Sequence, residues 1–187
     1  MAAKISAVLL AGGESRRMGR DKATFEFCGK ALWQNQFALL KKLDPFEIFV
    51  SARTNPFWRP DETIFAADEP PSRGPISGIA ATFKKMRTGH LIVLAIDLPL
   101  MSANYLRLLC AQIAKGRGIV PMIGDRAEPL AAIYPIEAAD DFTASLSKKD
   151  YSLQSVIKNL AAAKKVRLLP VATEDENLFC NLNSPPS

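Results

Sequence analysis

The sequence contains one histidine, His90, and only three cysteines among 187 residues. Cys28, Cys110 and Cys180 are widely spaced and form no C-x-x-C pair, so neither a disulfide framework nor a zinc site is indicated. A hydrolase triad needs a base beside its nucleophile, and His90 is expected to be structural because it begins an apolar, strand-like run. The cysteine usage is typical of a reducing cytoplasm, where we expect this chain to reside.

Long apolar runs are also lacking. The first, Ile5–Ala11, is too short for a signal-peptide core and far too short to span a bilayer. Aromatic residues make up only 8% of the chain, which disfavours a nucleic-acid module built on base stacking, although the net charge of +5 suits anionic partners. We therefore expect neither a membrane nor a nucleic acid as a partner.

The composition is that of an ordinary globular chain, with 48% hydrophobic and 23% charged residues. This length suffices for one hydrophobic core without disulfides or a structural metal. The sequence contains no repeat, no low-complexity tract and no linker. We expect residues 1–187 to form a single domain.

Strand-length apolar runs alternate with segments of helical period. The pattern predicts strands over 5–11, 46–52, 63–67, 90–96, 118–122, 130–134 and 166–171, and helices over 31–43, 77–87, 102–115, 137–146 and 152–162. An irregular segment is expected after residue 171. This alternation predicts an α/β fold with a mainly parallel, mixed sheet covered by helices on both faces. Ligands bind such sheets at the carboxyl ends of the strands.

The segment after the first strand, residues 10–22, reads L-A-G-G-E-S-R-R-M-G-R-D-K. Its glycines allow tight turns that present backbone N–H groups to an anion, and three arginines and a lysine surround the same space. The spacing fits neither a Walker loop nor a dinucleotide-binding G-x-G-x-x-G. The segment is interpreted as a phosphate cradle, with a solvated glycine-rich turn as the alternative.

Two aspartates follow predicted strands at the same edge of the sheet. Asp97 ends the apolar run 91–96, and a carboxylate there can hold Mg²⁺ together with substrate phosphates. The alternative is a helix-capping or salt-bridged aspartate. Asp68 ends 63–67, and it can equally be a turn former before two prolines. Cations and N–H groups beside a metal carboxylate favour group transfer between phosphates.

Two further segments bear polar or helix-starting features. Gly74–Gly78 leads into a predicted helix whose N-terminus can favour an anion or a base edge, or can be an ordinary turn. Asn181 and Asn183 are two apart, so in an extended segment their amides face the same way. By themselves they are equally typical of a polar terminus.

Taken in order, these motifs resemble the molybdenum cofactor guanylyltransferases of the nucleotidyltransferase superfamily. The matching stretches are L-A-G-G-x-S-x-R-M-G-x-D-K, Gly74-Pro75 with Gly78, Asp97-x-Pro99 and Asn181-x-Asn183-x-Pro185. The resemblance implies a Rossmann-like three-layer α/β/α domain of nucleotidyltransferase type. It also implies transfer of GMP from GTP to molybdopterin cofactor, with release of pyrophosphate and a requirement for Mg²⁺.

The resemblance assigns roles by position. It implies that the nucleotide is held by Leu10, Ala11, Gly12, Gly13, Ser51 and Asp68. Arg17, Lys22 and Asp97 form the implied catalytic set, in which Arg17 helps to hold the triphosphate, Lys22 contacts the phosphates and Asp97 binds the metal. Asn181 and Asn183 are expected near the metal and the pterin phosphate. The stretch 128–130 corresponds to a region for pterin recognition.

Some positions leave alternatives open. Ser51 stands where members of the family carry an asparagine, so Arg53 is an alternative contact. Relatives that use CTP tend to read L-A-A-G, and the missing methyl group at Gly12 leaves room for a purine, which favours GTP. A cytidylyltransferase for the same cofactor, an enzyme with another small phosphate acceptor, and a catalytically silent nucleotide-binding protein remain alternatives. We expect a monomer that makes transient contact with cofactor-biosynthesis proteins or molybdoenzymes.

Overall fold

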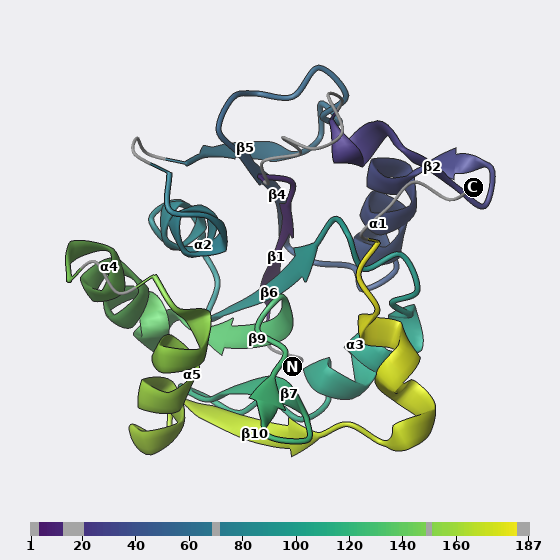
Figure 1. Cartoon of the computed structure of the whole chain (residues 1–187). Coiled ribbons are helices and arrows are strands. Elements are labelled where there is room, and N and C mark those ends of the chain that lie inside the picture. The colour runs from purple at the N-terminus through teal and green to yellow at the C-terminus, as the bar shows by residue number, and fades with distance from the viewer. Residues whose placement is uncertain (1–3, 13–20, 69–71, 149–150, 183–187) are drawn as a thin grey trace.

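The chain is described by a computed structural model that covers residues 4–12, 21–68, 72–148 and 151–182. Its centre is an eight-stranded sheet with the strand order β10-β7-β9-β6-β1-β4-β5, in which β8 pairs only with β7 (Figure 1). The strands are β1 (Ile5–Leu10), β4 (Glu47–Ala52), β5 (Ile64–Ala67), β6 (His90–Ala95), β7 (Gly118–Ile123), β8 (Arg126–Ala127), β9 (Ala131–Pro135) and β10 (Val166–Pro170). The predicted α/β class and mixed sheet are confirmed.

The middle of the sheet is parallel and buried. Every residue of β1 and β6 is buried, as expected for strands that are rich in Val, Ile and Leu and covered on both faces. In the parallel register, Leu10 lies opposite Ser51 of β4 and Ala95 of β6. The carboxyl ends of these three strands are therefore level with one another.

The α-helices of the described residues cover the two faces: α1 (Leu32–Lys41), α2 (Pro75–Phe83), α3 (Ala103–Cys110), α4 (Ala139–Ser147) and α5 (Leu153–Ala162). One hydrophobic cluster joins α1 and α3 to the sheet, and a second joins α2, α4 and α5 to it. Figure 1 shows these two helical layers on opposite sides of the strands. Short 3₁₀ segments also occur in the described ranges: η1 (Lys22–Thr24), η2 (Ile136–Ala138) and η3 (Thr173–Phe179).

Several elements differ from the sequence prediction. The hairpin β2 (Glu26–Phe27) to β3 (Lys30–Ala31) was not predicted, because two-residue strands carry no periodic signal. η3 lies in the segment expected to be irregular. α2 begins at Pro75, two residues earlier than predicted, because proline suits the first helical position. α3 ends at Cys110 instead of 115, because Ala114 and Arg117 form a bridge around Gly116, which has a positive φ.

The connections reverse direction beside β1. The chain passes from β1 through α1 to β4 and β5, then returns through α2 to β6 on the other side of β1. Such a switch point is where open α/β sheets bind ligands. Within the described ranges, no helix has the length and apolar character needed to cross a membrane.

Candidate active site

Lys22 and Asp97 meet at the switch point. Lys22 Nζ lies 3.2 Å from Asp97 Oδ2, and their side chains are 21% and 29% exposed. Lys22 begins η1 in the loop after β1, whereas Asp97 follows β6. The expected proximity of the two side chains is confirmed, and their partial exposure leaves both within reach of a ligand.

The position of Lys22 is set by its neighbour Asp21. The Asp21 carboxylate caps η1 by accepting from the backbone N–H of Ala23 at 3.0 Å. Its other oxygen accepts from Trp58 Nε1 at 2.6 Å, and the indole of Trp58 stacks on Trp33 with ring centroids 5.6 Å apart. The β4–β5 connection and α1 therefore anchor the turn from which Lys22 extends.

Asp68 is almost fully buried at the ends of β4 and β5, with 6% of its surface exposed. Ser51 Oγ donates to Asp68 Oδ1 at 2.8 Å, and Ser72 Oγ donates to Oδ2 at 3.1 Å. Because a buried carboxylate needs hydrogen-bond donors, these two hydroxyls orient it. The Ser51 hydroxyl therefore has a hydrogen-bond partner within the protein. The interpretation of Asp68 as a simple turn former does not account for the two hydrogen bonds that its carboxylate accepts.

Two glycines lie against this carboxylate. A Cβ atom on Gly12 would lie 3.0 Å from Asp68 Oδ2, and one on Gly78 would lie 2.6 Å from Ser51 Oγ and 3.2 Å from Asp68 Oδ1. The missing methyl group at Gly12 thus makes room for the Asp68 carboxylate. Gly12 follows Leu10 and Ala11 in the chain, and these two residues are held by hydrogen bonds from Ile96 N to Leu10 O and from Ala11 N to Ser51 O.

The C-terminal segment returns to the site. The backbone N–H of Leu182 donates to the carbonyl oxygen of Asp97 at 2.9 Å, and the neighbouring Asn181 is exposed. The segment that was expected near the metal and the pterin phosphate therefore lies beside Asp97. Gly13, Arg17 and Asn183 lie outside the described residues.

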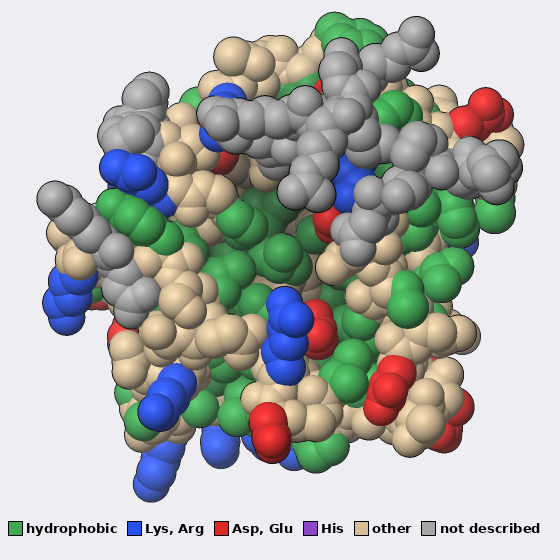
Figure 2. All heavy atoms as spheres, in the orientation of Figure 1, with side chains coloured by type: hydrophobic (Ala, Val, Ile, Leu, Met, Phe, Trp, Pro, Cys, Tyr) green, Lys and Arg blue, Asp and Glu red, His purple; other side chains and the backbone are tan. Residues whose placement is uncertain are grey.

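The stretch 128–130 lies on the same edge of the sheet. Leu130 O accepts from Ala95 N at 2.8 Å, which ties this stretch to the end of β6. Burial raises the pKa of Glu128, while the positive charge of Arg126 acts in the opposite direction. Figure 2 shows this face hollowed near its centre, with a hydrophobic floor and with charged side chains of both signs along the border.

The groups around Asp97 suit a metal ion that is coordinated partly by substrate, rather than one coordinated by protein side chains alone. Within the described part of the chain, no three His, Cys, Asp or Glu side chains gather into a metal-binding cluster. Mg²⁺ is commonly bound by one or two carboxylates together with water and substrate phosphates. The single, partly exposed carboxylate of Asp97 fits that mode of binding.

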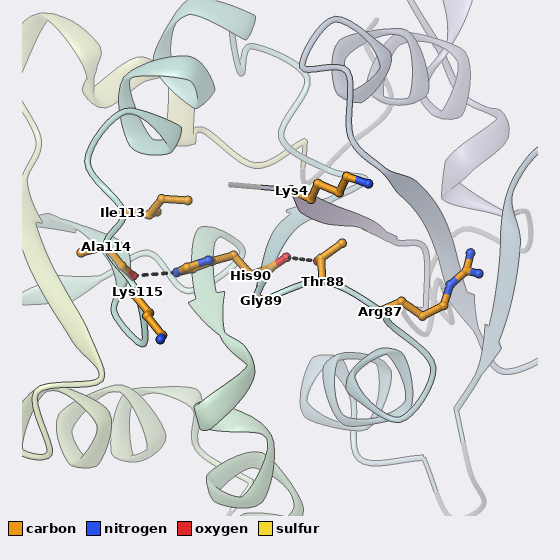
Figure 3. Close-up of a pocket in the computed structure, with 8 residues that line it drawn as sticks. All are labelled: Lys4, Arg87, Thr88, Gly89, His90, Ile113, Ala114 and Lys115. Atoms are coloured by element: carbon orange, nitrogen blue, oxygen red, sulfur yellow. Dashed lines mark hydrogen bonds between the residues drawn. The ribbon is translucent and has the colours of Figure 1, made fainter. Parts of the chain in front are cut away.

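His90 lies at the opposite edge of the sheet, beside a cavity of about 410 Å³. The His90 side chain is buried, and its Nε2 donates to the carbonyl oxygen of Ala114 at 3.0 Å. Figure 3 shows the charged ends of Lys4, Arg87 and Lys115 pointing away from the His90 ring. The expected structural role of this histidine is in keeping with these contacts.

Sequence reasoning missed three residues that organise the site, namely Ser72, Trp58 and Gln36. Ser72 donates a hydrogen bond to the carboxylate of Asp68, and Trp58 donates one to the carboxylate of Asp21. Gln36 donates to the carbonyl oxygen of Leu98, the residue after Asp97. Each of the three residues lies between the sequence motifs. Its hydrogen-bond partner is either distant in the chain or is not marked by any periodic pattern.

The chain is similar to known proteins over nearly its whole length. The "Probable molybdenum cofactor guanylyltransferase" of Opitutus terrae is 32% identical over 187 residues, covering 98% of this chain and 93% of the relative. The molybdenum cofactor guanylyltransferase of Syntrophotalea carbinolica is 30% identical, with 96% and 86% covered.

Solved structures show the same fold. Molybdopterin-guanine dinucleotide biosynthesis protein A from Archaeoglobus fulgidus superposes with a TM-score of 0.74 at 26% identity, over 96% of this chain and 93% of that one. The 4-diphosphocytidyl-2C-methyl-D-erythritol synthase of Anaerococcus prevotii, at 10% identity, also reaches 0.74 over 98% and 92%. Residues 7–166 match the family described as the MobA-like NTP transferase domain. The chain belongs to this family of nucleotidyltransferases.

Proposed function

We propose that this chain transfers GMP from GTP to molybdopterin cofactor and releases pyrophosphate. The observation that carries the proposal is the pairing of Lys22 with Asp97 at the sheet's switch point, 75 positions apart in the chain. Relatives named as molybdenum cofactor guanylyltransferases cover nearly the whole chain, which supports the choice of both substrates.

The chemistry requires alignment and charge neutralisation more than a strong base. A phosphate oxygen of the acceptor, already ionised at neutral pH, forms a bond to the α-phosphorus of GTP. The bond from that phosphorus to the oxygen bridging to the β-phosphorus breaks, and the electron pair leaves with pyrophosphate. Lys22 gives up its ion pair with Asp97 and binds the phosphates instead, where it neutralises negative charge. Arg17 is proposed to add to this charge.

We further propose that Asp97 holds Mg²⁺ between the protein and the triphosphate. The ion would supply Lewis-acid stabilisation of the charge that develops on the phosphate oxygens. Asp97 offers a hard, partly exposed carboxylate for this purpose. Asn181 and Asn183 are proposed to approach the pterin phosphate from the segment that bonds the Asp97 backbone.

Selection of guanine is proposed to depend on Asp68. Guanine presents two adjacent donors, N1–H and the 2-amino group, which match a carboxylate, whereas cytosine presents an acceptor at N3. The Asp68 carboxylate is oriented by Ser51 and Ser72, and Gly12 leaves room for it. Leu10, Ala11 and Gly13 are proposed to supply the backbone of the nucleotide loop.

Incubation of the full chain with GTP, Mg²⁺ and molybdopterin cofactor, followed by mass analysis, tests the proposal. The expected products are the guanine dinucleotide cofactor and an equal amount of pyrophosphate. Parallel thermal shifts with GTP, CTP and UTP test the choice of base, because selective binding to the folded state raises its stability. A cytidine dinucleotide, or a shift with CTP alone, would establish the cytidylyltransferase alternative instead.

A further inference from the structure

Three of the hydrogen bonds that hold the turn carrying Asp97 join it to other parts of the described chain. Ile96 N donates to Leu10 O at 3.0 Å, and Leu182 N donates to Asp97 O at 2.9 Å. The third bond comes from a side chain: Gln36 Nε2, on α1, donates to the carbonyl oxygen of Leu98 at 2.7 Å. Gln36 thus links the middle of a covering helix to the residue that follows the candidate metal carboxylate.

Stability alone explains the presence of Gln36 poorly. The side chain is 1% exposed, and within the described part of the chain its Oε1 has no hydrogen-bond partner. An unpaired buried acceptor destabilises the folded state. The carbonyl oxygen of Leu98 also accepts from Met101 N at 3.1 Å, so it would keep a donor without Gln36. An apolar residue of the same length would stabilise the core at least as well. A buried polar side chain with an unpaired acceptor therefore indicates a role other than stability.

We propose that Gln36 is a positioning residue for Asp97. By holding the Leu98 carbonyl, its amide fixes the turn and thereby the direction in which the Asp97 carboxylate faces bound Mg²⁺. This inference rests on the proposed function, since it concerns the same site. Outer contacts that orient a metal ligand typically change metal affinity or activity by about 10- to 100-fold when they are removed.

The test uses Gln36→Met in the full chain. Methionine has the length of glutamine and lacks both its donor and its acceptor, and a cavity of about 220 Å³ beside Gln36 leaves space for the sulfur. Gln34→Met is the matched control on the same helix. Gln34 is exposed, and its Oε1 accepts from Ala31 N at the start of α1, away from the Asp97 turn.

Two measurements separate positioning from folding. The first is the midpoint of thermal unfolding without ligand, expected to stay within about 3 °C of wild type for Gln36→Met, since a lost bond and a removed unpaired acceptor offset each other. The second is the Kd of GTP by calorimetry, in EDTA and in Mg²⁺. In EDTA the Kd of the variant for GTP should match that of wild type. The factor by which Mg²⁺ lowers this Kd should be about tenfold smaller in the variant than in wild type. Gln34→Met should lower the midpoint slightly and leave that factor unchanged.

The outcomes decide between the possible roles. An unchanged effect of Mg²⁺ in Gln36→Met would overturn the inference and leave the proposed function standing. A large fall in the midpoint, with GTP binding weakened equally in both buffers, would also overturn it in favour of a structural role. A wild-type chain that binds no GTP in either buffer would overturn both proposals together.

Discussion

Lys22 Nζ and Asp97 Oδ2 lie 3.2 Å apart although β2, β3, α1, β4, β5, α2 and β6 separate them in the chain. A cation and a carboxylate brought together at the edge of a buried parallel sheet neutralise each other before a ligand arrives. A triphosphate with its metal can replace both halves of that pair, because the phosphates attract the ammonium group and the metal attracts the carboxylate.

Asp97→Asn should abolish pyrophosphate release while leaving the fold intact. The side chain is partly exposed at the end of β6, so its neutralisation removes the proposed metal carboxylate without opening a cavity. We expect a loss of at least about 100-fold in rate, measured by a pyrophosphate-release assay. Asp140→Asn, an exposed position on α4, is the matched control and should retain the wild-type rate. Near-normal turnover in Asp97→Asn would place the metal elsewhere.

Lys22→Met should weaken GTP binding and slow turnover together. The ammonium group is proposed to contact phosphates in both the ground state and the transition state, so its loss should raise KM and lower kcat, each by about 10-fold or more. Steady-state kinetics with varied GTP measures both constants. Lys158→Met, exposed on α5, serves as the control. Unchanged constants in Lys22→Met would mean that the nucleotide loop is misassigned.

Ser51→Ala should lower stability as well as GTP affinity. The Ser51 hydroxyl is buried and donates to the buried carboxylate of Asp68, so the substitution should cost about 1–3 kcal/mol of unfolding free energy. Urea denaturation measures that cost. Ser147→Ala, an exposed position on α4, should stay within about 0.5 kcal/mol of wild type. A fully stable Ser51→Ala would show that the hydroxyl does not orient Asp68.

Gly12→Ala should shift base preference away from GTP. The added methyl carbon would lie 3.0 Å from Asp68 Oδ2, so the carboxylate must move or the loop must give way. We expect about a 10-fold loss of GTP affinity with little change for CTP, measured by calorimetry with each nucleotide. Gly89→Ala is the control, since no atom lies within 4 Å of its added Cβ. Equal losses of affinity for GTP and CTP would show that Gly12 does not determine base choice.

Glu47 should contribute to unfolding in acid. Burial tends to raise its pKa, but the backbone N–H of Arg87, the hydroxyl of Ser6 and the Arg87 guanidinium together hold that pKa below the usual 4.5. A carboxyl with a depressed folded pKa stabilises the fold above its unfolded pKa, and this stabilisation is lost as pH falls through the folded value.

Glu47→Gln should therefore flatten the fall in unfolding free energy below about pH 4.5, as measured by urea denaturation at a series of pH values. Glu62→Gln, at an exposed ion pair with Lys41, should flatten it less because solvent screens that pair. An unchanged acid slope in Glu47→Gln would assign the acid sensitivity to other groups.

The sequence by itself determined most of the elements and the position of the reactive edge. Runs of strand length that are mostly Val, Ile, Leu and Ala, such as 5–10 and 90–95, are typical of buried parallel strands, so both strands were predicted almost to the residue. Because a glycine-rich basic loop and an aspartate follow these two runs, their side chains were expected to converge at the carboxyl edge. This reasoning needs only local pattern and the direction of parallel strands.

Tertiary structure alone decided how the site is braced. The bonds from Ser72 to Asp68, from Trp58 to Asp21 and from Gln36 to Leu98 depend on where a loop or helix lies over the sheet. Likewise, the return of Leu182 to the Asp97 backbone depends on the path of the C-terminal segment. A residue's periodicity reports which face it buries, but a hydrogen-bond partner distant in the chain is selected only when the packed layers bring donor and acceptor within 3 Å or so.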